Sequence, residues 1–361
     1  LKSFYASVEC VDRGLDPFTE NLVVADPTRG SGTICLAITP AMKALGVKNR
    51  CRIFQIPNGI EYTMATPRMA RYMEVSAQIN ALYLRYVSTE DIHVYSIDEC
   101  FIDATPYLKL YHMGAKAFAK MLRNKVTEET GITATAGIGP NLFLAKVALD
   151  IEAKKAADGI GILDEESYKR EIWFHRPITD IWQVGPGIAH RLAKHGIHDM
   201  AGVCAANPAW LKKEFGKNGE YLLDHAWGQE PCTIKQIKEY RPAAHSISNG
   251  QVLMRDYSFS EARTVLREMA DASCLDLCSK GLSCGNVSVH VGYAQPHLTE
   301  SGRWGVGSGG STKLSERTDS SHRIVKVALE LFDKHTLNSE PIRRLTVALG
   351  ALQPTKYDQP S

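Results

Sequence analysis

A stretch near the C-terminus alternates apolar with polar residues, as expected for a strand with one buried face. Its apolar positions are Val287, Val289, Val291 and Tyr293. The polar positions between them are Ser288, His290 and Gly292. Around this strand the pattern predicts, in chain order, a strand at 246–253, a helix at 261–280, the strand at 286–293, a glycine-rich segment, a helix at 321–335 and a strand at 342–350. With the glycine-rich segment in the place of the third strand, the C-terminal third is predicted to have the order βαββαβ.

The N-terminal half shows the helical period of three and four between residues 67 and 87. The apolar positions of this period are Tyr72, Val75, Ile79, Leu82, Tyr83 and Tyr86. Beyond it the pattern predicts a β-hairpin at 92–102, a helix from about 111 to 129 and a strand at 132–137. With a strand end and a helix near 6–12 in front, these elements predict a sheet covered by helices on one face.

Turn and cap residues predict the remaining elements. Strands at 22–25 and 33–37 are joined by a turn-rich loop that lacks the Lys and helix of a phosphate loop. A short helix at 40–47 has Pro in its first turn and Gly near its end. A further helix is expected at 141–150.

Composition describes an ordinary globular protein of two to four domains, with 361 residues, 44% hydrophobic and 23% charged. The net charge of +2 neither requires nor excludes a nucleic-acid partner. Nine scattered cysteines fit a reducing cytoplasm, and no apolar run suggests a membrane span or signal peptide. Because the chain does not start with Met, we expect it to be a fragment.

Two acidic residues, Asp98 and Glu99, interrupt the predicted hairpin at its tip. Adjacent ionised carboxylates repel each other, and neither has a Lys or Arg neighbour in the strand. A hard divalent cation would neutralise them, and Mg²⁺ is commonly held by one or two carboxylates plus substrate phosphates. The alternative is an exposed polar turn, in which Asp and Glu are ordinary residues.

Two motifs resemble those of the Y-family translesion DNA polymerases, the UmuC and DinB group. They are the opening Leu1-Lys2-Ser3-Phe4-Tyr5-Ala6-Ser7-Val8-Glu9, which is closer to the UmuC-like branch, and Ser96-Ile97-Asp98-Glu99. The resemblance implies that Asp98 and Glu99 are catalytic and hold two Mg²⁺ ions. It also implies that the first metal-binding Asp would stand immediately before Leu1, so that Leu1 contributes at most its backbone carbonyl.

The same resemblance assigns residues to the incoming nucleotide. Tyr5 falls at the position of the aromatic steric gate that excludes a ribose 2′-hydroxyl. Phe4 beside it is a second nucleotide-side aromatic or, as we favour, a core residue. Lys43 fits a triphosphate-binding position of the fingers, and Lys154 fits a second one beyond the helix at 141–150, with Lys155 as the alternative.

DNA contacts are expected in the thumb and in the C-terminal domain. Gly185 and Gly187 belong to a stretch that resembles a helix-hairpin-helix, whose backbone N–H groups bind a phosphate; an ordinary corner between helices would look the same. The polar face of the βαββαβ sheet would face DNA. Lys313 and Arg317, beyond the glycine-rich segment, would line the template backbone or belong to a surface loop.

The resemblance thus implies an α+β multidomain right hand. Its expected parts are a palm (1–12 and 66–165), fingers (13–65), a helical thumb (166–230), a linker (231–244) and a little finger (245–355). The expected activity is error-prone, template-directed synthesis in DNA damage tolerance. The alternatives are another nucleotidyl-transfer palm, such as a cyclic-nucleotide synthase, or a non-catalytic DNA-binding protein. The expected partners are primer-template DNA, dNTPs and the replicative sliding clamp or accessory polymerase subunits, in a bacterial cytoplasm near the nucleoid.

Overall fold

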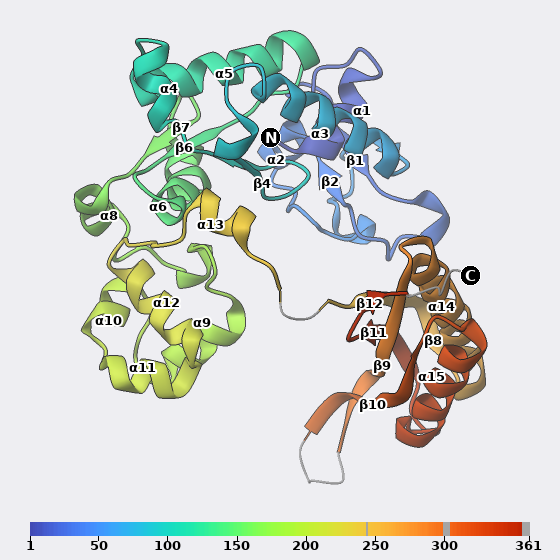
Figure 1. The fold of residues 1–361 in the computed structure, drawn as a ribbon. Helices are drawn as coiled ribbons and strands as arrows, with labels where there is room; N and C mark the ends of the chain where they lie inside the picture. The colour runs from blue at the N-terminus through green and yellow to red at the C-terminus, as the bar shows by residue number, and fades with distance from the viewer. Residues whose placement is uncertain (243–244, 299–303, 356–361) are drawn as a thin grey trace, which may run out of the picture. The chain divides into compact units, whose positions relative to one another are not determined.

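The computed structural model describes residues 1–242, 245–298 and 304–355. They form two units, Leu1–Tyr240 and Arg241–Ser361, whose ribbons are drawn in Figure 1. The division falls within the stretch predicted as a linker, 231–244. That stretch is not wholly irregular, because it contains helix α13 (Ile234–Glu239), which is capped by the side chain of Thr233.

The hairpin predicted at 92–102 is present in the first unit. Strands β4 (Ile92–Val94) and β5 (Cys100–Ile102) are antiparallel, with Val94 opposite Cys100. A second pair, β6 (Ala136–Ile138) and β7 (Ile160–Ile162), is parallel. The strand predicted at 132–137 is therefore shorter than expected. Its first part lies outside the ladder, where the carbonyl of Thr133 accepts a hydrogen bond from the amide of Lys2 at 2.9 Å.

Four helices of this unit pack in two hydrophobic clusters. They are α1 (Phe4–Val11), α3 (Met69–Tyr83), α4 (Thr105–Leu110) and α5 (Ala115–Thr130). The apolar stripe predicted for α3 is confirmed at Tyr72, Val75, Ile79 and Leu82, which are buried. Together with Phe4 of α1 they form one hydrophobic cluster, which holds α1 against α3.

A small three-stranded sheet lies between α1 and α3 in the sequence. Its strands, in spatial order, are β2 (Ala37–Ile38), β1 (Leu22–Val24) and β3 (Thr63–Ala65). The strand predicted at 33–37 is mostly irregular. An isolated antiparallel bridge pairs its Ile34 with Arg52, which lies outside the sheet. Helix α2 (Pro40–Ala44) ends three residues earlier than predicted. Gly46 stops it by adopting φ 82°, a conformation that costs glycine little.

The rest of the first unit is mainly helical. Its helices are α6 (Leu142–Val147), a π-helical turn (Ala148–Glu152), α7 (Ala153–Lys155), α8 (Glu165–Glu171), α9 (Pro186–Ala193), α10 (Met200–Ala205), α11 (Pro208–Phe215) and α12 (Lys217–Ala226). They enclose a second core around Phe143, Tyr168 and Leu211. Gly219 lets α12 approach α11 closely, since a Cβ there would lie 2.3 Å from the Leu211 carbonyl oxygen.

The second unit has the predicted βαββαβ order. Its elements are β8 (Ile247–Tyr257), α14 (Phe259–Ser279), β9 (Leu282–Leu298), β10 (Trp304–Thr318), α15 (Ser321–His335) and β11 (Ile342–Gly350), followed by the short β12 (Gln353–Pro354). The sheet order is β10-β9-β11-β8, and the strands pack on α14 and α15 in one core. The glycine-rich segment is part of strand β10 rather than a loop. Gly309 is needed there because a Cβ would lie 2.4 Å from the backbone carbonyl oxygen of Val289.

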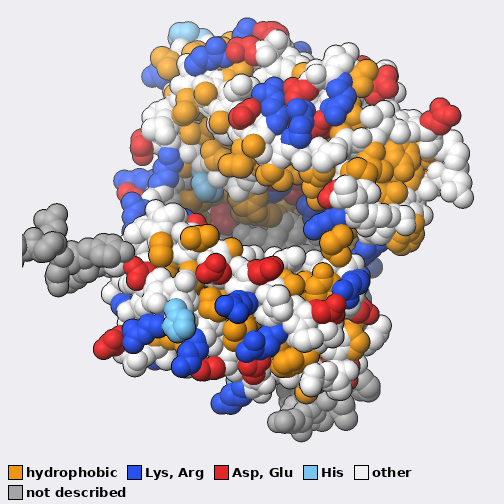
Figure 2. All heavy atoms as spheres, turned by 90° about the vertical axis from the view of Figure 1, so that its right-hand side faces the viewer, with side chains coloured by type: hydrophobic (Ala, Val, Ile, Leu, Met, Phe, Trp, Pro, Cys, Tyr) orange, Lys and Arg blue, Asp and Glu red, His pale blue; other side chains and the backbone are white. Residues whose placement is uncertain are grey.

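Charged side chains of both signs are interspersed on the face drawn in Figure 2, as the net charge of +2 suggests. Within the parts of the chain that the structure describes, no helix is both long and apolar enough to cross a bilayer.

Candidate active site

The two acidic residues lie at the tip of the β4–β5 hairpin, as predicted. The amides of Tyr95 and Ser96 both donate to the carbonyl of Glu99 at 3.0 Å, which closes the turn. The Ser96 hydroxyl donates to Oδ1 of Asp98 at 2.8 Å. The turn thus holds two adjacent carboxylates at the end of a short, rigid element.

Lys146 of α6 reaches the hairpin from a distant part of the sequence. Its Nζ lies 2.7 Å from Oε1 of Glu99 and 3.0 Å from Oδ1 of Asp150, and its side chain is only 10% exposed. Burial disfavours the charged form, but the bonds to Glu99 and Asp150 outweigh it and raise the pKa of Lys146. No Lys or Arg neighbours the acids within the strand, as the sequence indicates, but the fold supplies Lys146 from outside it.

The first residue of the chain also lies at the hairpin tip. The amine of Leu1 donates to the carbonyl of Asp98 at 2.7 Å. Burial lowers the pKa of this amine, although the charges of Asp98 and Glu99 oppose the shift. The backbone of Leu1 is therefore beside the carboxylates, where a role of its carbonyl as a metal ligand stays a prediction.

The donor set at the tip fits Mg²⁺. Asp98 and Glu99 offer hard carboxylate oxygens, and Mg²⁺ typically takes one or two carboxylates while water and phosphate oxygens complete its octahedron. Among the described residues, no three His, Cys, Asp or Glu side chains converge into a complete metal-binding group. These residues alone therefore do not complete the coordination of a metal ion. They fit a site in which a substrate supplies further ligands.

The two aromatic residues of α1 have different surroundings. Tyr5 is half-buried and stacks on Tyr72, with ring centroids 4.6 Å apart. Burial and the charge of Asp98 raise the pKa of Tyr5, so the acidic tip influences this phenol electrostatically. Phe4 is 3% exposed and belongs to the core of the unit. A nucleotide-binding role for Phe4 is therefore not supported, and its burial is that of a core residue.

Lysines from two elements gather near α1. Nζ of Lys43, on α2, donates to the Ser3 hydroxyl at 2.8 Å. Burial lowers the pKa of Lys43, and repulsion from Lys154 and Lys2 adds to the shift. Lys154 is thus near enough to influence Lys43 electrostatically. Lys155 instead forms an ion pair with Glu152 at 2.8 Å, which leaves Lys154 as the better candidate of the two.

Family comparisons agree with the resemblance in the sequence. Residues 1–150 match the impB/mucB/samB family and residues 244–361 match its C-terminal domain. The putative UV-damage repair protein UvrX of Bacillus subtilis (strain 168) is 31% identical, over 98% of this chain and 82% of its own length. This chain belongs to the impB/mucB/samB family, within the Y-family of DNA polymerases.

Two more relatives refine the assignment of this Y-family chain. DNA polymerase IV 2 of Bacillus subtilis (strain 168) is 33% identical, over 98% of this chain and 83% of its own length. The solved structure of the Y-family DNA polymerase chimera Dbh-Dpo4(243-245)-Dbh matches with a TM-score of 0.72 and 20% identity, over 98% of each chain, and shows the same fold. The α+β multidomain fold is thereby confirmed. The finer prediction of a UmuC-like branch stays a prediction.

The predicted DNA-binding glycines of this Y-family chain lie at the start of α9. Gly185 is its N-cap and Gly187 its second residue. A Cβ at either position would meet no other atom within 4 Å. Internal packing therefore does not require glycine at these two positions, and the space beside the helix end is open.

The polar face of the second unit is built from small residues. The register places four rows across the strands: Ser248, Ala348, Ser288 and Ser311; Gly250, Thr346, His290 and Gly309; Val252, Arg344, Gly292 and Gly307; and Gly350, Asn286 and Lys313. Neighbouring Ser288 and Ser311 hydroxyls are 3.0 Å apart. We call this surface the small-residue face.

Lys313 and Arg317 lie on β10 of the second unit rather than in a loop. They line a groove of about 660 Å³ at the edge of the small-residue face, with His245 and Asn286. The guanidinium of Arg317 already donates to the carbonyl of Ala351. Lys313 and Arg317 thus share one groove, in a different unit from Asp98.

The sequence analysis missed three residues of the site: Ser96, Lys146 and Tyr72 as the partner of Tyr5. A signal for Lys146 existed, because Lys146 and Asp150 are four residues apart in a predicted helix and so face the same side. Nothing in the sequence pointed from Lys146 to Glu99, which is 47 residues away.

Proposed function

We propose that this chain is a template-directed DNA polymerase of the translesion type, which joins dNTPs to a primer 3′-hydroxyl with two Mg²⁺ ions. The observation that carries the proposal is the pair Asp98 and Glu99 on a closed hairpin turn, with one Lys between Glu99 and Asp150. Family membership supports it, since similar proteins are named DNA polymerase IV.

In this proposal Asp98 and Glu99 hold the metal. When bound, Mg²⁺ would lower the pKa of the attacking hydroxyl and neutralise charge on the triphosphate. A residue joined to the Leu1 nitrogen would lie beside the Asp98 carbonyl, which is where the third carboxylate of the family is expected. The Ser96 hydroxyl would orient the carboxylate of Asp98, and the Lys146 ammonium would orient that of Glu99.

Nucleotide binding would use α1 and the lysines near it. Tyr5 would stand under the sugar and exclude a 2′-hydroxyl. Burial lowers the pKa of Lys43, and the charges of Lys154 and Lys2 add to the shift. A triphosphate, which carries several negative charges, would favour the charged form of Lys43 and bind Lys154 as well. The binding of a dNTP would therefore stabilise a pair of cations that repel each other in its absence.

DNA would be held mostly through its backbone. The amides at the start of α9, around Gly185 and Gly187, would bind a phosphate. The small-residue face, with Lys313 and Arg317 in the groove beside it, would receive the template strand. The β1–β3 sheet of the fingers has strands of two or three residues, so a loose closure over the nascent pair, and low fidelity, are expected. A sliding clamp or accessory subunit would be a further partner.

The proposed domains keep the predicted boundaries: palm at 1–12 and 66–165, fingers at 13–65, thumb at 166–230, linker at 231–244 and little finger at 245–355. The proposed place of action is DNA damage tolerance in a bacterial cytoplasm, near the nucleoid. A relative named a putative UV-damage repair protein supports that role.

Primer extension with Mg²⁺ and dNTPs tests the proposal. We expect extension by the chain with one Asp added before Leu1, weaker extension by the chain as printed, and none when Asp98→Asn is made in either form. The matched control is Glu90→Gln, which removes one exposed carboxylate just before the same hairpin and should leave extension unchanged. Equal extension with and without Asp98→Asn would contradict the proposal. DNA binding without extension in every form would favour the non-catalytic alternative.

A further inference from the structure

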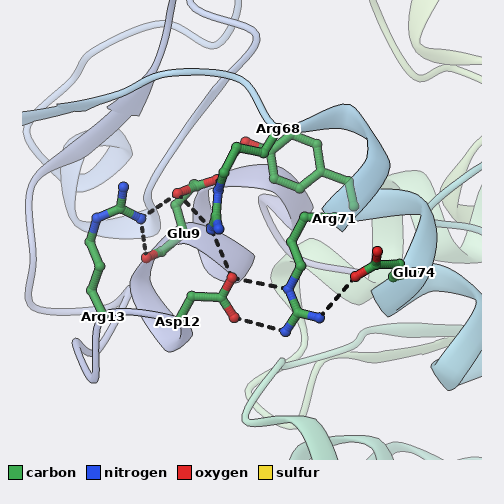
Figure 3. A network of polar contacts seen from close by, with 7 residues as sticks. Glu9, Asp12, Arg13, Arg68, Arg71 and Glu74 are labelled. Carbon is green, nitrogen blue, oxygen red and sulfur yellow. Dashed lines mark hydrogen bonds and ion pairs between the residues drawn. The ribbon is translucent and has the colours of Figure 1, made fainter.

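Two contacts, one helical turn apart, join α1 to α3. Tyr5 and Glu9 are four residues apart on α1 and share one face, while Arg68 and Tyr72 have the same spacing at the start of α3. Tyr5 stacks on Tyr72 with ring planes inclined by 19°. Glu9 accepts from Arg68 through Nε at 2.9 Å and Nη2 at 3.0 Å, as Figure 3 shows.

Tyr72 belongs to both contacts. Its side chain is completely buried, and its hydroxyl donates to Oε1 of Glu9 at 2.8 Å. Burial would disfavour an ionised Glu9, but hydrogen bonds from Arg68, Arg13 and Tyr72 lower its pKa below the ordinary value. Burial raises the pKa of Tyr72, and the bond to Glu9 adds to the shift, so the phenol keeps its proton and remains the donor.

The ring of Tyr72 is therefore fixed by its hydroxyl as well as by packing. Glu9 cannot move to release it, because Glu9 is held by Arg68 and Arg13, and Arg68 is held in turn by Asp12 at 2.7 Å. Tyr5, in contrast, is only half-buried and has Tyr72 as its stacked neighbour. A contact that excludes a single hydroxyl group requires the excluding ring to be placed within about 0.5 Å.

We propose that Tyr72 is a positioning residue for Tyr5 and thereby sets how strongly the site rejects a ribonucleotide. The inference rests on the proposed function, in which Tyr5 meets the sugar of the incoming nucleotide. Tyr72 acts from behind the ring of Tyr5, while Glu9 and Arg68 keep Tyr72 in place. The sugar specificity of this site is thus determined partly by an ion pair that touches no substrate.

Equilibrium binding of dCTP and CTP measures the preference of the site for a deoxyribonucleotide without a catalytic step. The full chain is bound, in Mg²⁺ buffer, to a primer-template whose primer ends in a dideoxynucleotide and whose next template base is guanine. The readout is the ratio of the two dissociation constants. We compare the unmodified chain with Tyr5→Ala, Tyr72→Leu and Tyr72→Phe. The matched control is Tyr107→Phe, because the Tyr107 hydroxyl also donates to a carboxylate, Oδ2 of Asp91 at 2.6 Å, but away from Tyr5.

We expect the unmodified chain to bind dCTP more tightly and Tyr5→Ala to lose most of this preference. Tyr72→Leu removes both the stack and the hydrogen bond, and should reduce the preference about tenfold. Tyr72→Phe keeps the ring and should reduce it about two- to fivefold. In each variant the weaker preference should come from tighter CTP binding, with dCTP binding changed less than about threefold. General loss of structure would not produce that pattern.

The outcomes separate the two proposals. The positioning role would be overturned if Tyr72→Leu kept the full preference for dCTP while Tyr5→Ala lost it. If the Leu variant does not fold, Tyr72→Phe takes its place in this comparison. The role of Tyr5 as the gate would then remain. An unchanged preference in Tyr5→Ala would overturn the role of Tyr5 itself, and that of Tyr72 with it. A change in Tyr107→Phe as large as in Tyr72→Phe would also overturn the inference, because the effect would then be general.

Discussion

The first unit contains two clusters of acidic residues that differ in how they are neutralised. Around α1 and α3, three carboxylates (Glu9, Asp12 and Glu74) meet three guanidinium groups (Arg13, Arg68 and Arg71), as Figure 3 shows. At the hairpin, three carboxylates (Asp98, Glu99 and Asp150) have one side-chain cation among them, Lys146. The first cluster is complete by itself, and the second still has the capacity to bind a cation.

The number of counter-ions, rather than the presence of acids, therefore distinguishes a structural cluster from a candidate metal site. Burying a charge without a partner is costly, so Glu9, which is completely buried, is matched by its arginines. The acids at the hairpin are only partly buried, and water can stabilise the excess charge until a metal binds. Substitutions in the two clusters should therefore affect different properties.

The largest expected effect is on catalysis at the hairpin. We expect Glu99→Gln to reduce primer extension by about 10²- to 10⁴-fold, because several kcal/mol of transition-state stabilisation by the metal depend on its ligands. Single-turnover extension measures the change. Glu74→Gln, in the neutralised cluster, is the control and should extend at the unmodified rate; a comparable loss in both variants would remove the distinction between the clusters.

The second effect is on stability, and it should be larger in the neutralised cluster. Glu9→Gln leaves Arg68, Arg13 and the Tyr72 hydroxyl without a carboxylate, which should lower the free energy of unfolding by about 1–3 kcal/mol. Glu99→Gln should lower it by less, since it relieves repulsion from Asp98. Urea unfolding followed by circular dichroism compares the two, and a larger loss in Glu99→Gln would contradict the comparison.

The third prediction concerns pH. The pKa of Glu9 is lowered from an ordinary value of 4.5, so its ionised form stabilises the folded state fully above about pH 4.5. This contribution is lost as the pH falls through the lower pKa of the folded state. The difference in unfolding free energy between the unmodified chain and Glu9→Gln should therefore shrink from pH 6 to pH 3. A difference that stays constant over this range would show that Glu9 contributes no charge interaction.

The smallest effect should come from the edge of the neutralised cluster. Glu74 is 62% exposed and lies 3.3 Å from Nη1 of Arg71. Exposed ion pairs contribute little, because water and salt screen them. Glu74→Ala should change the free energy of unfolding by less than about 0.5 kcal/mol, and a loss as large as that of Glu9→Gln would mean that the cluster acts as one unit.

Two elements of the second unit could be predicted to the residue. The bounds 321–335 and 342–350 agree with α15 and β11, because long periodic stretches carry many independent signals. The first unit was harder, since strands of two or three residues, such as β2, hold too few residues for a period to show. In β10 the frequent glycines concealed a strand whose pairing is determined by its neighbour β9.

The candidate active site could be predicted where its residues lie in one continuous stretch. Asp98 and Glu99 are adjacent in the sequence, and the strands on both sides indicated a hairpin. Contacts between distant segments, such as Lys146 with Glu99 or Tyr5 with Tyr72, depend on how helices pack, and the sequence pattern does not encode that packing locally. The same reason explains why the sequence did not point to Lys146 as the partner of Glu99.

The small-residue face has a consequence for movement along a polymer. Its rows consist mainly of Gly, Ser, Ala and Thr, and charged side chains appear only at Arg344 and Lys313. Hydrogen bonds from short hydroxyl groups contribute little net free energy because water competes for them. Glycine has no side chain that would obstruct a strand moving across the face. A strand lying on this face would be able to slide by one nucleotide at a time, so the face is suited to repeated steps rather than to a fixed grip.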